Sequence, residues 1–140
     1  MHHYEDLPGR RQAEFSRFGH DIRNLVIHIE DYYAPVLGEF EHLVLLALLR
    51  LGNGAYGANI LREIRERTQR DVPIGSVYVT LARLEKKKLV VSYVGNPSHE
   101  RGGRRRKHYI LNDPGQRALG RAYRALKAMT SGIERDLENL

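Results

Sequence analysis

Residues 102–111 read GGRRRKHYIL, so two glycines lead into four consecutive cations that run into an apolar tail. Arginine side chains bind phosphate groups and the edges of bases. Glycines allow the backbone to turn tightly and to approach another backbone closely. The tail is predicted to be a β-strand, whose alternation puts Lys107, Tyr109 and Leu111 on one face and Arg106, His108 and Ile110 on the other. These residue types favour a hairpin whose tip and returning strand present positive charge to a polyanion.

The positive charge is concentrated in the middle of the chain. The 140 residues carry a formal net charge of +6. Residues 38–112 hold 14 Lys and Arg against 7 Asp and Glu, whereas residues 1–37 hold 4 against 6. Localised basicity of this kind indicates nucleic acid as a partner, although charge alone leaves a solvated surface as an equal alternative.

Composition and motifs exclude several other classes of protein. There is no cysteine, which excludes disulfides, thiolate metal sites and cysteine nucleophiles. The longest uncharged apolar run, Leu43 to Leu49, is too short to span a membrane, and the N-terminus has no apolar signal core. We therefore expect a cytoplasmic protein without membrane contact. Scattered histidines, with no nucleophile elbow or phosphate loop, predict no catalytic residue, no metal site, no cofactor and no enzyme activity.

Apolar residues at heptad spacing predict one amphipathic helix on each side of the basic segment. The first covers residues 15–32. The second is expected as a single helix that begins with Asp113 as its N-cap and Pro114 in its first turn. Its apolar face is formed by Leu119, Ala122, Leu126, Met129, Ile133 and Leu140. A narrow stripe needs a partner helix, and we favour a homodimer over packing on the chain's own core.

The basic segment is predicted to form three helices and a two-stranded hairpin. The helices are expected at residues 39–51, about 56–69 and about 74–88, and the strands at residues 89–94 and 105–111. This order is that of a winged helix-turn-helix, mainly α with a small two-stranded β wing and with flanking N- and C-terminal helices. The predicted domains are an N-terminal extension with an amphipathic helix (1–37), a winged-helix DNA-binding domain (38–112) and a C-terminal dimerisation helix (113–140).

The third helix carries residues suited to reading DNA. Val77, Leu81 and Leu84 are spaced to fix it on the core. Its outer face would then hold small side chains that allow close approach to a major groove, and hydroxyls that can bond bases or phosphates. The DNA-binding residues expected there are Gly75, Ser76, Tyr78, Val79, Thr80 and Arg83. Plain packing is the alternative interpretation of any amphipathic helix.

Three motifs in combination resemble the PadR family of bacterial transcription regulators over about residues 37–120. They are Tyr56–Gly57 at the start of the second helix, the Gly-x-Val-Tyr-x-x-Leu-x-x-Leu-Glu pattern at Gly75–Glu85, and the Gly-Arg-Arg-x-x-x-Tyr-x-Leu pattern at Gly103–Leu111. The resemblance implies a dimeric winged-helix repressor with its C-terminal helix at the dimer interface and with Tyr78 near DNA. A dimer of this kind is expected to bind a palindromic operator. The further DNA-binding residues expected are Tyr56, Arg101, Gly103, Arg104, Arg105 and Arg106.

Two residues depart from the pattern of the family. Lys88 stands where a glycine usually closes the third helix, so a residue with a side chain is predicted to adopt a positive φ. Asn112 stands where threonine usually follows the wing, and either residue can cap the next helix.

The resemblance also implies relief of repression by a small aromatic effector. The residues available to line such a site at the dimer interface are Tyr32, Tyr33 and Tyr123, although packing in a plain core is the favoured interpretation of these residues. The chain has no tryptophan, so binding of a drug between tryptophans, as in some relatives, is not expected. The alternative function is a winged-helix module that binds protein and has no specific affinity for DNA.

Overall fold

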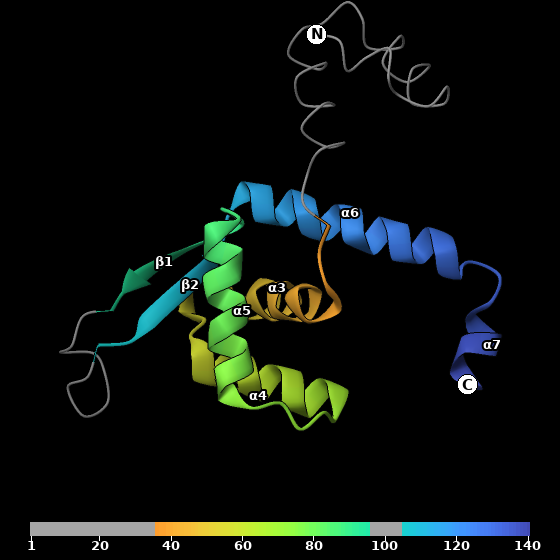
Figure 1. Ribbon diagram of the computed structural model, residues 1–140, viewed down its shortest axis with the longest axis horizontal. Coiled ribbons are helices and arrows are strands. Elements are labelled where there is room, and N and C mark those ends of the chain that lie inside the picture. Colours follow the sequence, from red (N-terminus) through yellow and green to blue (C-terminus); the bar gives the residue numbers. More distant parts are fainter. Residues whose placement is uncertain (1–35, 96–104) are drawn as a thin grey trace, which may run out of the picture. The chain divides into compact units, whose positions relative to one another are not determined.

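The computed structural model describes residues 36–95 and 105–140, and the helix predicted at residues 15–32 lies outside these ranges. The described residues confirm a mainly helical fold with a two-stranded wing (Figure 1). The elements in chain order are α3 (Glu39–Leu51), the short 3-10 turn η2 (Gly52–Gly54), α4 (Gly57–Thr68), α5 (Ile74–Lys86), β1 (Val90–Val94), β2 (Lys107–Leu111), α6 (Asp113–Thr130) and α7 (Glu134–Glu138).

The core lies where α3, α4 and α5 pack against one another. Its fully buried side chains are Val44, Leu45, Leu48, Ile60, Val77, Leu81 and Leu84. The predicted inner face of α5 is confirmed. On α3 the buried arc is wider than a single stripe, because this helix also packs against β2 and α6. Leu45 is therefore fully buried, although the apolar spacing did not place it on the inner face.

The wing is an antiparallel pair in which Val90 lies opposite Leu111 and Tyr93 opposite His108. Figure 1 shows the two strands side by side, projecting away from the helical core. The other edge of β2 meets the turn after α3, where the Tyr109 N–H donates to the Ala55 carbonyl over 2.9 Å. Tyr109 and Leu111 are buried, which confirms the predicted alternation along this strand.

The C-terminal helix differs from the prediction at both ends. Its N-cap is Asn112, whose Oδ1 accepts a hydrogen bond from the Gly115 N–H, and Asp113 is already the first helical residue. The expected single helix is interrupted, because α6 ends at Thr130 and Gly132 has a φ of 87° that a right-handed helix cannot contain. The chain resumes as the short helix α7. Only the first turns of α6 are buried, and the remainder extends beyond the core (Figure 1).

Among the described helices, none combines the length and the apolar character needed to cross a membrane.

Candidate nucleic-acid interface

The outer face of α5 is open to solvent. Gly75, Val79 and Arg83 are exposed, and the Tyr78 side chain is 49% exposed. Ser76 is half-buried at the start of the helix. The helix presents this face because Val77, Leu81 and Leu84 hold the opposite side in the core. A major groove about 12 Å wide admits a helix with such small and hydroxyl-bearing residues.

Thr80 does not belong to this face, so the prediction that it faces solvent is wrong. Its side chain is only 5% exposed. In helical geometry Thr80 lies three residues after Val77 and four before Leu84, which places it on the same side as those core residues. A small residue in an amphipathic helix suits either face, and the hydroxyl alone did not decide between them.

Two predicted residues lie together at the loop end of the wing, where Arg106 lies just beyond the last strand pair, Val94–Lys107. The guanidinium carbon of Arg106 lies 4.3 Å from the centre of the Tyr56 ring. Arg105, beside it, is exposed. The other cations and the glycine predicted for the wing tip, Arg101, Gly103 and Arg104, lie outside the described residues.

Glu85 attaches the wing to α5, a role that the sequence did not reveal. One carboxylate oxygen accepts from the Ser92 hydroxyl at 3.0 Å, and the other lies 3.3 Å from the Lys107 ammonium. Both strands are therefore fixed to the last turn of the same helix. The available signal was the position of Glu85 at the end of the glycine–tyrosine motif, but a glutamate there is also an ordinary surface residue.

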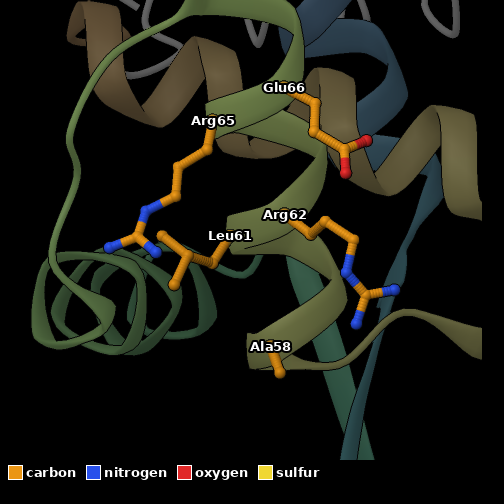
Figure 2. Close-up of a pocket in the computed structure, with 5 residues that line it drawn as sticks. All are labelled: Ala58, Leu61, Arg62, Arg65 and Glu66. Atoms are coloured by element: carbon orange, nitrogen blue, oxygen red, sulfur yellow. The ribbon is translucent and has the colours of Figure 1, made fainter.

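The outer face of α4 carries exposed cations. Figure 2 shows Arg62 and Arg65 leaving successive turns of the helix in different directions, with Leu61 between them. Together with Ala58 and Glu66 they line a shallow hollow of about 300 Å³. The Arg65 guanidinium has a structural role, because its Nε donates to the Val72 carbonyl at 3.0 Å and so holds the connection between α4 and α5.

The later turns of α6 present an apolar surface. Leu126 is 55% exposed and Met129 is 78% exposed, and Ile133 and Leu137 continue the surface beyond the break. Tyr123 lies beside them and is exposed, with the Lys127 ammonium 6.0 Å from its ring centre. The other two predicted effector residues, Tyr32 and Tyr33, lie outside the described residues. Within residues 36–95 and 105–140, no group of three or more possible metal ligands occurs.

A helical core that exposes one face of its third helix, with a basic two-stranded wing fixed to that helix, defines a DNA-binding protein of the winged helix-turn-helix class. Residues 45–121 match the Transcriptional regulator PadR-like family, and the chain belongs to this family. Proteins of the family are transcription regulators that bind DNA. The chain is therefore a transcription regulator and not an enzyme.

Solved structures of relatives agree with this assignment. A PadR family transcription regulator from Clostridium difficile is 28% identical, with a TM-score of 0.61 over 71% of this chain and 99% of that one. A PadR family transcriptional regulator from Eggerthella lenta is 25% identical, with a TM-score of 0.56 over 73% of this chain and 88% of that one. A PadR-like transcriptional regulator from Bacillus cereus, 23% identical with a TM-score of 0.57 over 70% of this chain and 89% of that one, has the same fold. Comparison with curated proteins finds no significant match.

Proposed function

We propose that the chain is a transcriptional repressor that binds a palindromic operator as a homodimer in the cytoplasm. Residues 38–112 bind DNA in this proposal, and residues 113–140 form the dimer. The observation that carries the proposal is the double contact of Glu85 with Ser92 and Lys107, which fixes the basic wing beside the exposed face of α5. A helix in the major groove and a wing on the neighbouring backbone can then bind one duplex together.

The two elements have different tasks in the proposed complex. Ser76, Tyr78 and Arg83 on α5 are placed to contact base edges, and so decide which sequence is preferred. Arg105 and Arg106, with the cations of the wing tip, contact phosphates and so supply affinity that does not depend on sequence. Gly75 and Val79 contribute close approach and apolar contact rather than hydrogen bonds.

The exposed apolar surface of α6 supports the homodimer. Leu126 and Met129 face solvent in the single chain, although burial of such side chains is favourable. A twofold axis through this surface would place the α5 helices of the two protomers at two half-sites of the operator. The centres of these half-sites would lie about 10 bp, or a multiple of that spacing, apart. A small aromatic effector at the same interface, against Tyr123, would relieve repression by changing the distance between the two α5 helices.

Selection of bound sequences from random DNA, followed by footprinting upstream of the protein's own gene, tests the proposal. The expected result is a protected palindrome whose affinity falls with salt, with a slope of about −0.9 for each neutralised phosphate. A reporter gene behind that palindrome should be expressed less when the protein is present. A winged-helix module for protein binding would give no enriched sequence and no protected palindrome even at low salt, and that result would overturn the proposal.

A further inference from the structure

Tyr56 and Gly57 are consecutive residues that lie between the wing and α5, which is the recognition helix of the proposed complex. Tyr56 precedes α4 with extended backbone, and its N–H donates to Asn59 Oδ1 over 2.7 Å. It also pairs with His108 as an isolated antiparallel bridge to β2. The backbone of the dipeptide is thus fixed both to the first turn of α4 and to the wing.

The Tyr56 side chain forms part of a stack near the loop end of the wing. Its ring lies under the Arg106 guanidinium at 4.3 Å and meets the His108 ring edge-on at 5.8 Å. On the far side, His108 stacks on Tyr93 with 5.0 Å between ring centres and 17° between planes. The Tyr93 hydroxyl donates to the Asn53 carbonyl at 2.9 Å, which connects the stack to the turn after α3. Arg106 therefore lies over a ring that is itself held from several sides.

Gly57 has a different neighbour, the side chain of Tyr78 on α5. A Cβ atom on residue 57 would lie 2.6 Å from the hydroxyl oxygen and from two ring carbons of Tyr78, closer than atoms can approach. The tip of the Tyr78 ring occupies the space that the missing side chain leaves. Its other side remains in solvent, since the side chain is 49% exposed.

We propose that Tyr56 and Gly57 are positioning residues that hold one DNA-contacting side chain from each element. Tyr56 orients Arg106 toward a phosphate. Gly57, by having no side chain, leaves the space in which the Tyr78 ring lies when it contacts bases. Tyr56 thus acts through Arg106 rather than as a contact of its own. This inference rests on the proposed function, and it goes further by assigning one dipeptide to both halves of the interface.

The roles of Tyr56 and Gly57 can be measured separately, because phosphate contacts and base contacts affect DNA binding in different ways. A phosphate contact contributes equally to all sequences and to the salt slope, whereas a base contact contributes to the preferred sequence and hardly to the slope. A guanidinium that loses the ring beneath it would be less ordered before binding, so its contact would weaken. A displaced Tyr78 would reach the wrong position in the groove while leaving the charge of the protein unchanged.

The test measures binding of the full chain to its selected operator and to a scrambled duplex, by fluorescence anisotropy over a range of salt. Tyr56→Leu should weaken both duplexes by about 3- to 10-fold and flatten the slope by about 0.9, because one phosphate contact is lost. Tyr56→Phe keeps the ring and should behave as wild type. Gly57→Ala should weaken the operator by about 10-fold and leave the scrambled duplex and the slope unchanged. Its thermal midpoint should stay close to wild type, because the flexible tip of Tyr78 can move aside.

Double variants distinguish positioning from a loss of folding. Tyr56→Leu should have no further effect in an Arg106→Gln background, and Gly57→Ala none in a Tyr78→Ala background. Independent, additive effects would overturn the inference, as would a Tyr56→Leu protein with wild-type affinity and slope. Arg106→Gln alone leaves the ring in place, so it still reports the phosphate contact if Tyr56→Leu folds poorly. A wild-type protein that does not prefer its selected operator would instead overturn the proposed function, and this inference with it.

Discussion

The side-chain amide of Asn112 donates a hydrogen bond to the backbone carbonyl of Lys88 over 3.0 Å. Its oxygen accepts from the Gly115 N–H at 2.8 Å, so one side chain caps α6 and also holds Lys88, two residues after the end of α5. Lys88 has a φ of 62°, in the left-handed region that disfavours residues with a Cβ atom. The recognition helix, the wing and the C-terminal helix are therefore joined at a position of backbone strain.

Replacing Lys88 with glycine should stabilise the protein. Glycine adopts a positive φ without steric cost, and the bond from Asn112 uses only the backbone carbonyl of residue 88. We expect Lys88→Gly to raise the free energy of unfolding by about 0.5–1 kcal/mol, measured by urea denaturation. Lys86→Gly is the matched control, since residue 86 is helical, and it should lower that free energy by about 1 kcal/mol. Equal losses in both variants would show that Lys88 is not strained.

Sequence predicted the parts of the fold that periodicity and local backbone rules govern. The spacing of Val77, Leu81 and Leu84 located the inner face of the recognition helix. The missing glycine at Lys88 predicted the positive φ there, because the geometry of a helix end depends on a few adjacent residues. The alternation along β2 correctly placed Tyr109 and Leu111 on one face of the strand, and the structure shows that both are buried.

Contacts between side chains far apart in the chain could not be predicted in the same way. Nothing in the local pattern distinguishes the Glu85 that binds both wing strands from a solvated glutamate. The position of Arg106 over Tyr56 depends on the register of β2 against the turn after α3, which only the folded structure fixes. Thr80 is a different case, because helical spacing alone places it on the side of Val77 and Leu84, whereas its hydroxyl suggested the outer face.

The buried carboxylate of Glu41 should make stability depend on acid pH. Burial disfavours its charge, but the Lys87 ammonium at 2.7 Å and the Gly38 N–H at 3.0 Å outweigh burial and lower its pKa. A carboxyl whose pKa is lower in the folded state stabilises the protein above the pKa of the unfolded chain. That contribution disappears as pH falls through the lowered value. Glu41→Gln should therefore cost about 2 kcal/mol at neutral pH and much less in acid, measured by urea denaturation across pH.

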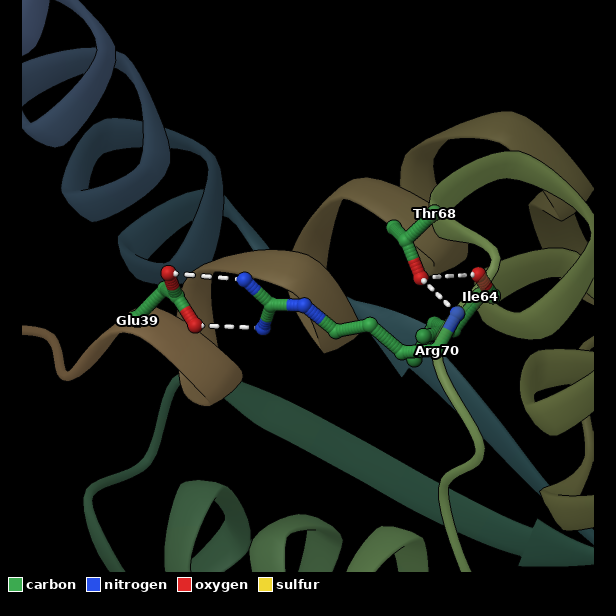
Figure 3. Close-up of polar contacts among 4 residues, drawn as sticks. All are labelled: Glu39, Ile64, Thr68 and Arg70. Carbon is green, nitrogen blue, oxygen red and sulfur yellow. Dashed lines mark hydrogen bonds and ion pairs between the residues drawn. The ribbon is translucent and has the colours of Figure 1, made fainter. Parts of the chain in front are cut away.

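A second carboxylate on the same helix provides the control. Figure 3 shows the two terminal nitrogens of Arg70, which follows α4 in the chain, donating hydrogen bonds to the Glu39 carboxylate. Hydrogen bonds from Arg70 lower the pKa of Glu39, but this pair lies in solvent, where ion pairs contribute little. Glu39→Gln should leave the urea midpoint close to that of wild type. If both variants lost the same stability at neutral pH, burial of Glu41 would not be the cause of its effect.

Thr80 and Ser76 should differ in their effect on DNA binding, although they lie one helical turn apart. Thr80 is buried, so Thr80→Val keeps its shape in the core and should leave operator affinity unchanged. Ser76 lies at the start of the outer face, and Ser76→Ala should cost about 1–3 kcal/mol on the operator if its hydroxyl contacts a base. Anisotropy with the operator and a scrambled duplex measures both. Loss of operator preference in Thr80→Val alone would show that this hydroxyl reaches the groove.

Arg105, an exposed cation at the loop end of the wing, should act on all DNA sequences alike. Arg105→Ala removes one charge outside the core, so it should weaken operator and scrambled duplex by the same factor. The slope of log affinity against log salt should become shallower by about 0.9. Lys127→Ala, which removes a cation from α6, is the control and should leave the slope unchanged. A change of preferred sequence in Arg105→Ala would mean that the wing reads bases.

The apolar surface of α6 should prove to be the dimer interface. Leu126→Asp places a charge among Met129 and the neighbouring apolar residues. In a twofold interface both protomers contribute this charge. We expect the dimer dissociation constant to rise by at least about 100-fold, measured by analytical ultracentrifugation, since each buried leucine contributes about 2 kcal/mol. Ala128→Asp, an exposed position on a different face of α6, should leave the dimer intact. A Leu126→Asp protein that still sedimented as a dimer would place the interface on another surface, and its unchanged operator affinity would confirm that conclusion.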